Sequence, residues 1–319
     1  MISFLYPGQG SQYIGMGQTL YDTFSDAKDV FQEVDETLKQ NLSKLMFSGD
    51  ESDLKLTENA QPALMAVSIA VQRVLETQFN TPVNTAKYVA GHSLGEYAAL
   101  CATGVFSLDA TARLLKIRGH SMQKAVPVGM GGMAALIGAS LEQAQEIVQK
   151  AAEKTRDNAC ICEIANDNAP GQIVISGHSE AIKAAIDIAK EVGIKRALPL
   201  PVSAPFHSSL MAPAREPMAL ALKEESIRQM PLTSVVSNVS ATPIESIEDI
   251  HSRLLDQITG RVRWVESMDY MIKNGVTTFV EVGSGKVLSG LMKRINKEMT
   301  AYSLETPDDL EAFAKRQTA

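Results

Sequence analysis

The sequence predicts an α/β protein from three observations. Short apolar runs alternate with helical patterns along 319 residues, of which 45% are hydrophobic and 21% charged, as in soluble chains with a large core. Residues 88–100, YVAGHSLGEYAAL, have the pattern of a strand, a tight turn and a helix. Residues 126–200 follow a different order of strands and helices. We therefore expect a large body interrupted by a smaller inserted unit.

The first element is an apolar strand, Ile2–Tyr6, followed by the loop Pro7–Gln12. Glycines in this loop let the backbone approach a neighbour closely. Its spacing fits neither a phosphate loop nor a dinucleotide-binding turn, because Tyr13 stands where the third glycine would be. Helical periodicity follows over residues 18–47, 59–77 and 108–124, with the second nearly continuous in apolar residues and the third capped by Ser107.

Gly91-His92-Ser93-Leu94-Gly95 has the form G-x-S-x-G. In a nucleophile elbow the serine occupies a strained turn between a strand and a helix, which exposes its hydroxyl above the sheet. The helix behind it directs N–H groups towards negative charge that develops beside the serine. The five-residue pattern alone also arises by chance in glycine-containing loops. The strand before it and the helix after it favour the elbow.

Residues 126–200 predict a strand, a helix, two strands, a helix and a strand in that order. The expected bounds are 132–137, 141–154, 160–165, 172–176, 180–192 and 194–200. This βαββαβ order is typical of a ferredoxin-like unit. We therefore expect an inserted ferredoxin-like subdomain at 126–200, a discontinuous body at 1–125 and 201–319, and a ligand cleft between them.

The C-terminal third predicts a strand at 234–238, a helix through 258 and a last strand at 277–282. Gly283–Lys286 is similar to part of a nucleotide-binding loop, but Val280 and Val287 replace residues that such a loop requires. We interpret it as a strand-to-helix turn. The tail after Thr306 is expected to be loosely held.

Composition excludes several classes of function. A net charge of −7 disfavours nucleic acid as the main partner. No apolar run reaches the roughly 20 residues of a membrane span, so the expected location is the cytoplasm. The three cysteines cannot build a disulfide framework, and no cluster indicates a metal or redox cofactor.

A serine nucleophile needs a base, and the chain has five histidines. His92 is expected to pack away from the serine, His120 and His251 to be surface residues, and His178 to be a turn residue. His207 follows a proline-stiffened loop where the chain returns from the insert to the body, and it is the candidate base. A structural histidine at this position remains an alternative.

Several motifs together resemble the malonyl-CoA:acyl carrier protein transacylase family, in its order and over nearly the whole chain. They are PGQGSQ at 7–12, GHSLGEY at 91–97, Arg118-Gly119, LPLPVS at 198–203, Phe206-His207 and VRW at 262–264. The resemblance implies an acyltransferase with an α/β hydrolase-like core, a mainly parallel sheet and a nucleophile elbow. Without fused domains, the chain is most similar to the freestanding enzyme of dissociated fatty-acid synthesis.

The resemblance implies that Ser93 attacks the thioester of malonyl-CoA and that His207 accepts the proton of the serine hydroxyl. The resulting malonyl-serine would pass its acyl group to the phosphopantetheine thiol of acyl carrier protein in a ping-pong reaction. The resemblance places the oxyanion hole at the backbone N–H groups of Gln9 and Leu94. It also implies that a backbone carbonyl near Gln257 orients the histidine in a Ser-His dyad.

Arg118 is the expected specificity residue. An arginine on an amphipathic helix is ordinarily a surface residue, but the resemblance implies that this one binds the free carboxylate of malonyl in a bidentate pair. Acetyl groups should then be rejected, since the guanidinium would lack its partner. Phe206 is similar to the malonyl-selecting form of its loop, while Ala204-Pro205 departs from the modular acyltransferase pattern.

The carrier protein is acidic in this family, so a net negative chain requires a local basic patch for docking. The candidates are Lys195, Arg196, Lys286, Lys293 and Arg294, each of which could equally be a solvated surface charge. We expect a monomer with no nucleic-acid or membrane partner.

Two other functions use the same residues. A serine hydrolase with water as acceptor would need the elbow and the histidine but not Arg118. A non-catalytic scaffold that binds the carrier would keep the fold and lose Ser93 or His207, yet both are present.

Overall fold

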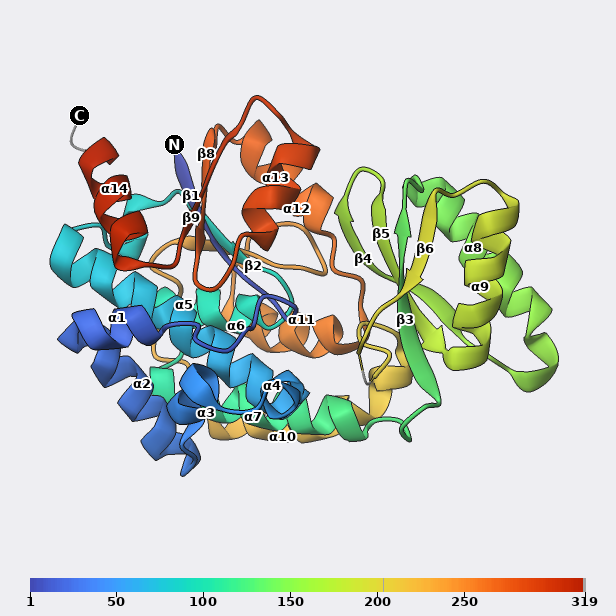
Figure 1. Ribbon diagram of the computed structural model, residues 1–319, viewed down its shortest axis with the longest axis horizontal. Coiled ribbons are helices and arrows are strands. Elements are labelled where there is room, and N and C mark those ends of the chain that lie inside the picture. The colour runs from blue at the N-terminus through green and yellow to red at the C-terminus, as the bar shows by residue number, and fades with distance from the viewer. Residues whose placement is uncertain (203, 318–319) are drawn as a thin grey trace.

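The computed structural model describes residues 1–202 and 204–317. Ser203, which closes one of the sequence motifs, lies outside the described residues. Figure 1 shows a large body that holds both termini and, beside it, a smaller unit that contains β3 to β6 and two helices. None of the described helices is long and apolar enough to cross a membrane.

The body is built on a five-stranded parallel sheet in the order β7-β2-β1-β8-β9. Its strands are β1 (Ile2–Tyr6), β2 (Tyr88–Gly91), β7 (Ser234–Val236), β8 (Thr278–Val282) and β9 (Thr300–Leu304). The register pairs Tyr6 with Gly91, so β1 and β2 end side by side. The loops that follow them therefore leave the same edge of the sheet, where ligands of open parallel sheets bind.

Helices pack around this sheet and bury most of the apolar side chains. In the N-terminal half they are α1 (Gln18–Thr23), α2 (Ser25–Leu38), α3 (Leu42–Ser48), α4 (Glu51–Lys55), α5 (Thr57–Phe79), η1 (Val83–Thr85), α6 (Gly95–Ala102) and α7 (Leu108–Lys124). In the C-terminal half they are η3 (Ser209–Ala214), α10 (Arg215–Glu224), α11 (Ile247–Thr259), α12 (Trp264–Lys273), α13 (Val287–Ile295) and α14 (Pro307–Gln317). The expected bounds of α7, with Ser107 as its N-cap, agree with the structure.

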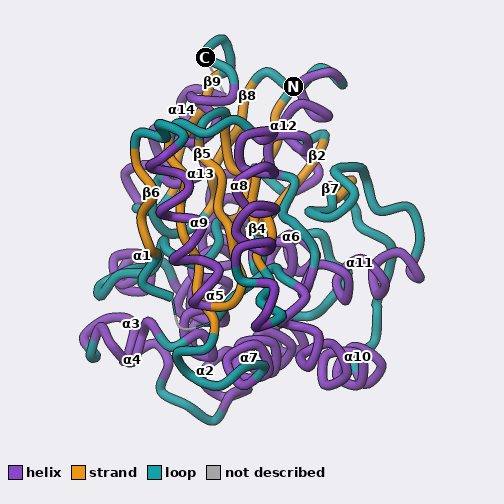
Figure 2. The backbone as a smooth tube through the Cα atoms, turned by 90° about the vertical axis from the view of Figure 1, so that its right-hand side faces the viewer, coloured by secondary structure: helices purple, strands orange, loops and turns teal. Residues whose placement is uncertain are grey.

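The smaller unit has a four-stranded antiparallel sheet in the order β4-β5-β3-β6. Its elements are β3 (Gly131–Ile137), α8 (Leu141–Lys154), η2 (Arg156–Asn158), β4 (Cys162–Ala169), β5 (Gln172–His178), α9 (Ser179–Glu191) and β6 (Arg196–Pro199). Figures 1 and 2 show α8 and α9 together on the face of the sheet that points away from the body. They enclose a separate apolar cluster with that sheet. The element order is the predicted βαββαβ.

Two predictions for the C-terminal region are wrong. Thr278–Val282 is not the last strand, because β9 pairs with it in parallel at the sheet edge. The described part of the segment after Thr306 is not loosely held, because residues 307–317 form α14, in which Leu310 is 0% and Phe313 2% exposed. The carboxylate of Asp309 accepts hydrogen bonds from Thr306 at the start of this helix. Buried apolar contacts and a capped first turn hold the segment in place.

Candidate active site

Ser93 lies in the turn between β2 and α6, with a backbone φ of 54°. This left-handed conformation costs a non-glycine residue on the order of 1–3 kcal/mol, and close packing enforces it here. A Cβ on Gly91 would lie 1.9 Å from the carbonyl carbon of Gly95, and one on Gly95 would lie 2.2 Å from the Tyr6 oxygen. Strand and helix thus cross so closely that only glycine fits on either side of the serine.

His207 is hydrogen-bonded to the serine. Its Nε2 lies 2.8 Å from Ser93 Oγ, and its Nδ1 lies 2.9 Å from the backbone oxygen of Gln257. A carbonyl oxygen only accepts, so Nδ1 carries the proton and Nε2 is the acceptor that faces the hydroxyl. His207 also has a left-handed φ, of 57°, and is 4% exposed. The ring is fixed in the tautomer that a general base requires.

The surroundings of His207 keep the imidazole neutral. Burial, followed by the positive charge of Arg118, lowers its pKa to about 3, against which the hydrogen bond to Gln257 acts only weakly. A neutral imidazole can accept a proton over the whole range near neutral pH.

Arg118 is a buried residue of α7, not the surface residue that its amphipathic helix would ordinarily indicate, since it is only 1% exposed. Its Nη1 donates to Gln61 Oε1 at 2.8 Å. Its Nη2 donates to Gln257 Oε1 at 2.8 Å and to Ser93 Oγ at 3.2 Å. The guanidinium also lies over the Tyr97 ring. Among the described residues no carboxylate contacts this cation, which is unusual for a buried arginine.

A second layer of hydrogen bonds holds the turn from below. Asn238 accepts the Ser93 N–H at 2.7 Å through Oδ1 and donates to the Gly91 oxygen at 2.7 Å through Nδ2. The Gln257 amide nitrogen donates to the backbone oxygen of Ser93 at 2.9 Å and to Glu96 Oε2 at 2.6 Å. Glu96, Gln257 and Asn238 are each 0% exposed. These buried hydrogen bonds fix the backbone of the turn from both sides of Ser93.

The other predicted site residues lie around this centre. The loop that carries Gln9 packs against the serine turn, since a Cβ on Gly8 would lie 2.6 Å from the His92 oxygen. The Gln9 side chain reaches Thr57 Oγ1 at 3.5 Å. Leu94 is 1% exposed at the start of α6, and Phe206 is 8% exposed and packs in the main core.

The remaining histidines lie elsewhere. His92 points away from the serine, as expected, and bonds to Asn168 Oδ1 at 2.7 Å while packing on Trp264. His120 pairs with Glu58 at the surface, and His178 ends β5 and accepts from the Ile161 N–H. His251 lies partly exposed on α11, with its Nε2 buried and without a hydrogen bond.

The five basic residues considered for docking are all exposed, and some of them lie close together. Arg294 on α13 donates to Gln172 Oε1 on β5 at 3.1 Å. Gln172 and Arg196 both pair with Ile137, from opposite sides of β3. Two strand spacings, or roughly 10 Å, therefore separate the backbones of Gln172 and Arg196. The insert and α13 of the body together place basic side chains at one end of the insert sheet.

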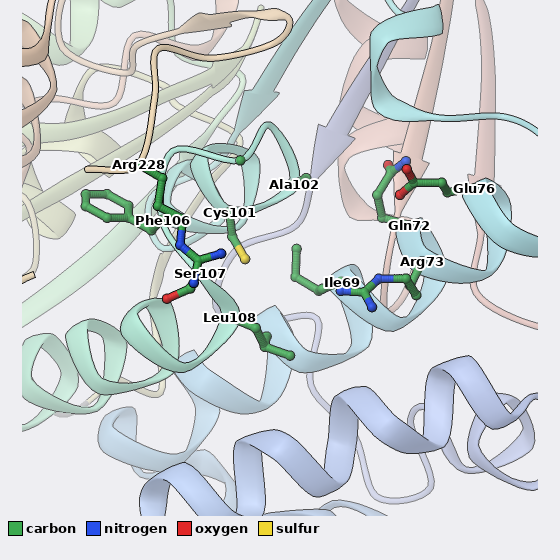
Figure 3. A pocket seen from close by; sticks show the side chains of 11 residues that line it. Ile69, Gln72, Arg73, Glu76, Cys101, Ala102, Phe106, Ser107, Leu108 and Arg228 are labelled. Atoms are coloured by element: carbon green, nitrogen blue, oxygen red, sulfur yellow. The ribbon is translucent and has the colours of Figure 1, made fainter. Parts of the chain in front are cut away.

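A cavity of about 160 Å³ lies at the opposite end of α6 from Ser93. Figure 3 shows Cys101 between the side chains of Arg73 and Arg228 in this cavity. None of the candidate catalytic or binding residues lines it. The cavity is thus separate from the Ser93 centre, which is defined by its hydrogen-bonded side chains.

The acyl transferase domain family matches residues 3–306 of the chain. The chain belongs to this family. It is 45% identical over 310 residues to the malonyl CoA-acyl carrier protein transacylase of Bacillus subtilis strain 168, covering 97% of this chain and 95% of that protein.

Solved structures have the same fold as this acyl transferase over nearly its whole length. The crystal structure of an acyl-carrier-protein-S-malonyltransferase from Bartonella henselae has a TM-score of 0.95 at 50% identity, covering 100% of this chain and 99% of that one. A malonyl-transacylase in complex with its type II PKS acyl-carrier protein has a TM-score of 0.93 at 37% identity, covering 99% of both chains. The sequence prediction of the family and of an α/β fold is confirmed.

Four residues at the centre of this acyl transferase were not predicted: Gln61, Glu96, Tyr97 and Asn238. Glu96 and Tyr97 follow the serine motif directly, where the sequence indicated only helix formers. A charged residue immediately after G-x-S-x-G, in a helix that must be buried, was the available signal. Gln61 and Asn238 come from distant elements and gave no local signal.

Proposed function

We propose that this acyl transferase moves a malonyl group from malonyl-CoA to the phosphopantetheine thiol of an acyl carrier protein, through a malonyl ester of Ser93. The observation that carries the proposal is Arg118, a buried cation 3.2 Å from the Ser93 hydroxyl whose partners are neutral. An acyl group with a free carboxylate would supply the directly bonded anion that Arg118 lacks. The relatives named for malonyl transfer support the same substrate.

In the proposed mechanism His207 Nε2 accepts the Ser93 proton as Oγ attacks the thioester carbonyl. The Gln257 carbonyl keeps Nδ1 protonated and stabilises the imidazolium that forms. The histidine then gives its proton to the leaving CoA sulfur. The acceptor thiol repeats these steps in reverse, so no cofactor takes part.

The backbone N–H groups of Leu94 and Gln9 are the proposed oxyanion hole. Leu94 is the N-cap of the helix behind the nucleophile, and the loop of Gln9 packs on the serine turn. Losing one such donor costs roughly 100- to 1000-fold in rate. In this proposal Phe206 shapes the acyl pocket beside His207 and limits substitution on the α-carbon.

Malonyl loading places the substrate carboxylate on Arg118. For this the guanidinium exchanges amide or hydroxyl acceptors for two carboxylate oxygens in a bidentate pair. An acetyl group offers no such acceptor. It therefore gains none of this binding energy in the transition state, and loading should be slower.

An acidic carrier protein would dock at the basic residues Lys195, Arg196, Lys286, Lys293 and Arg294. The complex of a related transacylase with its acyl-carrier protein supports a carrier as acceptor. We further propose a monomer that acts in the cytoplasm, in fatty-acid synthesis.

Intact mass spectrometry after mixing with malonyl-CoA, acetyl-CoA or methylmalonyl-CoA tests the proposal. Wild type should gain a malonyl adduct that is absent in Ser93→Ala and leaves when holo carrier protein is added. Arg118→Ala should lose malonyl loading by at least about 100-fold relative to acetyl loading.

Arg113→Gln on the same helix is the matched control, because Arg113 is already paired with Asp109 and Glu225. It should load malonyl like wild type. Equal loading of acetyl and malonyl by wild type would refute the role of Arg118. An adduct that water removes as fast as the carrier does would make the protein a hydrolase.

A further inference from the structure

Glu96 is a buried acid directly below the candidate nucleophile. Its side chain is 0% exposed on α6. Oε2 accepts the Gln257 amide at 2.6 Å and the Asn238 N–H at 3.2 Å. Oε1 is shielded from solvent and makes no close hydrogen bond, and the nearby Ser237 hydroxyl helps to lower the pKa of the carboxyl group. None of the catalytic steps proposed above uses this carboxyl group.

The Gln257 carboxamide joins Glu96 to Arg118. Its Oε1 accepts from Arg118 Nη2 at 2.8 Å, and its Nε2 donates to Glu96 Oε2 at 2.6 Å. An amide with a cation at its oxygen and an acid at its nitrogen is polarised in one direction, which strengthens both bonds. Arg118 and Glu96 are thus opposite ends of one buried hydrogen-bonded chain.

The charges around Glu96 are few among the described residues. Arg118 comes from α7, and His207, from the loop before η3, reaches the same Gln257. Tyr97 is its neighbour on α6, while Asn238 and Gln257 are neutral. Burial raises the pKa of Glu96 to about 7, and its hydrogen bonds and Arg118 act against that rise. A new charge beside Arg118 therefore changes the protonation of Glu96, because the pKa of this carboxyl group lies near neutral pH.

We propose that Glu96 balances the charge of Arg118 in the empty enzyme and takes up a proton when a carboxylate-bearing acyl group binds Arg118. The inference rests on the proposed function, because the malonyl carboxylate supplies the new negative charge. With it, one buried cation would face two buried anions, and protonating Glu96 restores neutrality. Oε1 makes no close hydrogen bond, so it is the oxygen that would carry this proton.

The proton balance of acylation makes the uptake measurable. The Ser93 proton leaves on the CoA sulfur, so ester formation by itself consumes no proton. At pH 7.5 the released thiol ionises to at most about a tenth, which is a small release in the opposite direction. Protons taken from the medium during malonyl loading therefore report a group of the enzyme.

In the experiment, enzyme and malonyl-CoA are mixed in a stopped-flow instrument in weakly buffered solution, and a pH indicator reports the protons taken up. Intact mass spectrometry of the same mixture measures the amount of malonyl-Ser93. At pH 7.5 we expect roughly half to three quarters of a proton taken up per malonyl-Ser93, because a carboxyl group with a pKa of about 7 is about three-quarters ionised there. Glu96→Gln keeps an oxygen acceptor for Gln257 and Asn238 and should load more slowly, with the uptake per adduct lost. CoA alone should give no uptake.

The pH dependence provides a second test that needs no variant. Proton uptake by Glu96 must shrink as the pH falls from 7.5 to 5.5, because at pH 5.5 Glu96 is already protonated before malonyl loading. Uptake by His207 would grow towards acid pH instead, since its pKa is about 3. Three results would overturn the inference. They are a malonyl adduct in wild type without proton uptake, proton uptake that persists in Glu96→Gln, and proton uptake that grows towards acid pH. Failure to form any adduct refutes the proposed function as well.

Discussion

The two sheets of the molecule contribute very differently to the candidate site. The parallel sheet of the body supplies the Gln9 loop after β1, the Ser93 turn after β2 and Asn238 after β7. The antiparallel sheet of the insert contacts the serine motif through Asn168, whose Oδ1 accepts a hydrogen bond from His92 Nε2. Most of its buried side chains serve its own core. A complete fold can thus sit beside a reactive centre and carry almost none of its chemistry.

Strand direction explains this difference. Parallel strands bring all their carboxyl ends to one edge, so residues from distant parts of the chain meet there. Antiparallel strands alternate their ends, and the insert gathers no comparable set of loops. The bulged end of β4 packs on the body, where Asn166 bridges to Val262, and Met133 of β3 and Val174 of β5 join the main core. The following predictions test how far this division extends.

The largest effect is expected at the body site. His207→Ala removes the only imidazole within reach of Ser93 among the described residues, so kcat/KM should fall by about 100- to 10,000-fold. His178→Ala in the insert is the comparison, and its activity should stay within a fewfold of wild type. Carrier-dependent malonyl transfer at fixed pH measures both. A comparable loss in both variants would contradict the division between the sheets.

The sequence was informative where the chemistry is local. The strand, turn and helix around Ser93 lie within one stretch of chain, and His207 stood out because the other histidines had local structural explanations. The role of Arg118 came only from the family resemblance. Its burial depends on α5 and α11 meeting α7, which no local pattern encodes. Asn238 and Gln61 remained invisible for the same reason.

Local patterning also failed at the C-terminus. In β9 only Leu304 is buried, so the strand lacks the apolar run that marked β1 and β8. In α14 two buried residues, Leu310 and Phe313, stand among charged neighbours. Edge elements of a sheet contact the core on one side only, and their sequences resemble those of loose tails.

The second prediction concerns this edge of the body. Leu310→Ala leaves a cavity between α14 and the core, so the free energy of unfolding should fall by about 2–5 kcal/mol. Malonyl loading at low temperature should be unchanged, because α14 contributes no residue to the site. Urea unfolding measures the first quantity and intact mass the second. Glu311→Ala, an exposed neighbour, should change stability by less than about 0.5 kcal/mol.

The third prediction follows from the lowered pKa of His207. Between its ordinary value near 6.5 and about 3, the unfolded chain binds one more proton than the folded protein. This contribution therefore destabilises the fold progressively as the pH falls below 6.5, at up to about 1.4 kcal/mol per pH unit. His207→Gln lacks it, so from pH 7 to pH 5 the variant should lose about 2 kcal/mol less stability than wild type.

Urea unfolding of both proteins at the two pH values tests this prediction. Glu96 contributes equally to both proteins, so its contribution cancels when the stability changes of the two are subtracted. The raised pKa of Glu96 has the opposite effect, since the folded state binds the extra proton between about 4.5 and 7. Parallel pH profiles for wild type and His207→Gln would mean that the imidazole titrates normally in the folded protein.

The smallest effect is expected where the two sheets meet. Asn168→Ala removes the hydrogen bond to His92 Nε2 and leaves a partly buried ring nitrogen unpaired, which should cost about 1 kcal/mol. Malonyl loading should slow by less than about tenfold, because Asn238 and Gln257 hold the Ser93 turn independently. Asn158→Ala, at the insert surface, is the control and should match wild type. If Asn168→Ala instead approached the loss caused by His207→Ala, the insert would be setting the geometry of the nucleophile, and the main sheet alone would not explain the site.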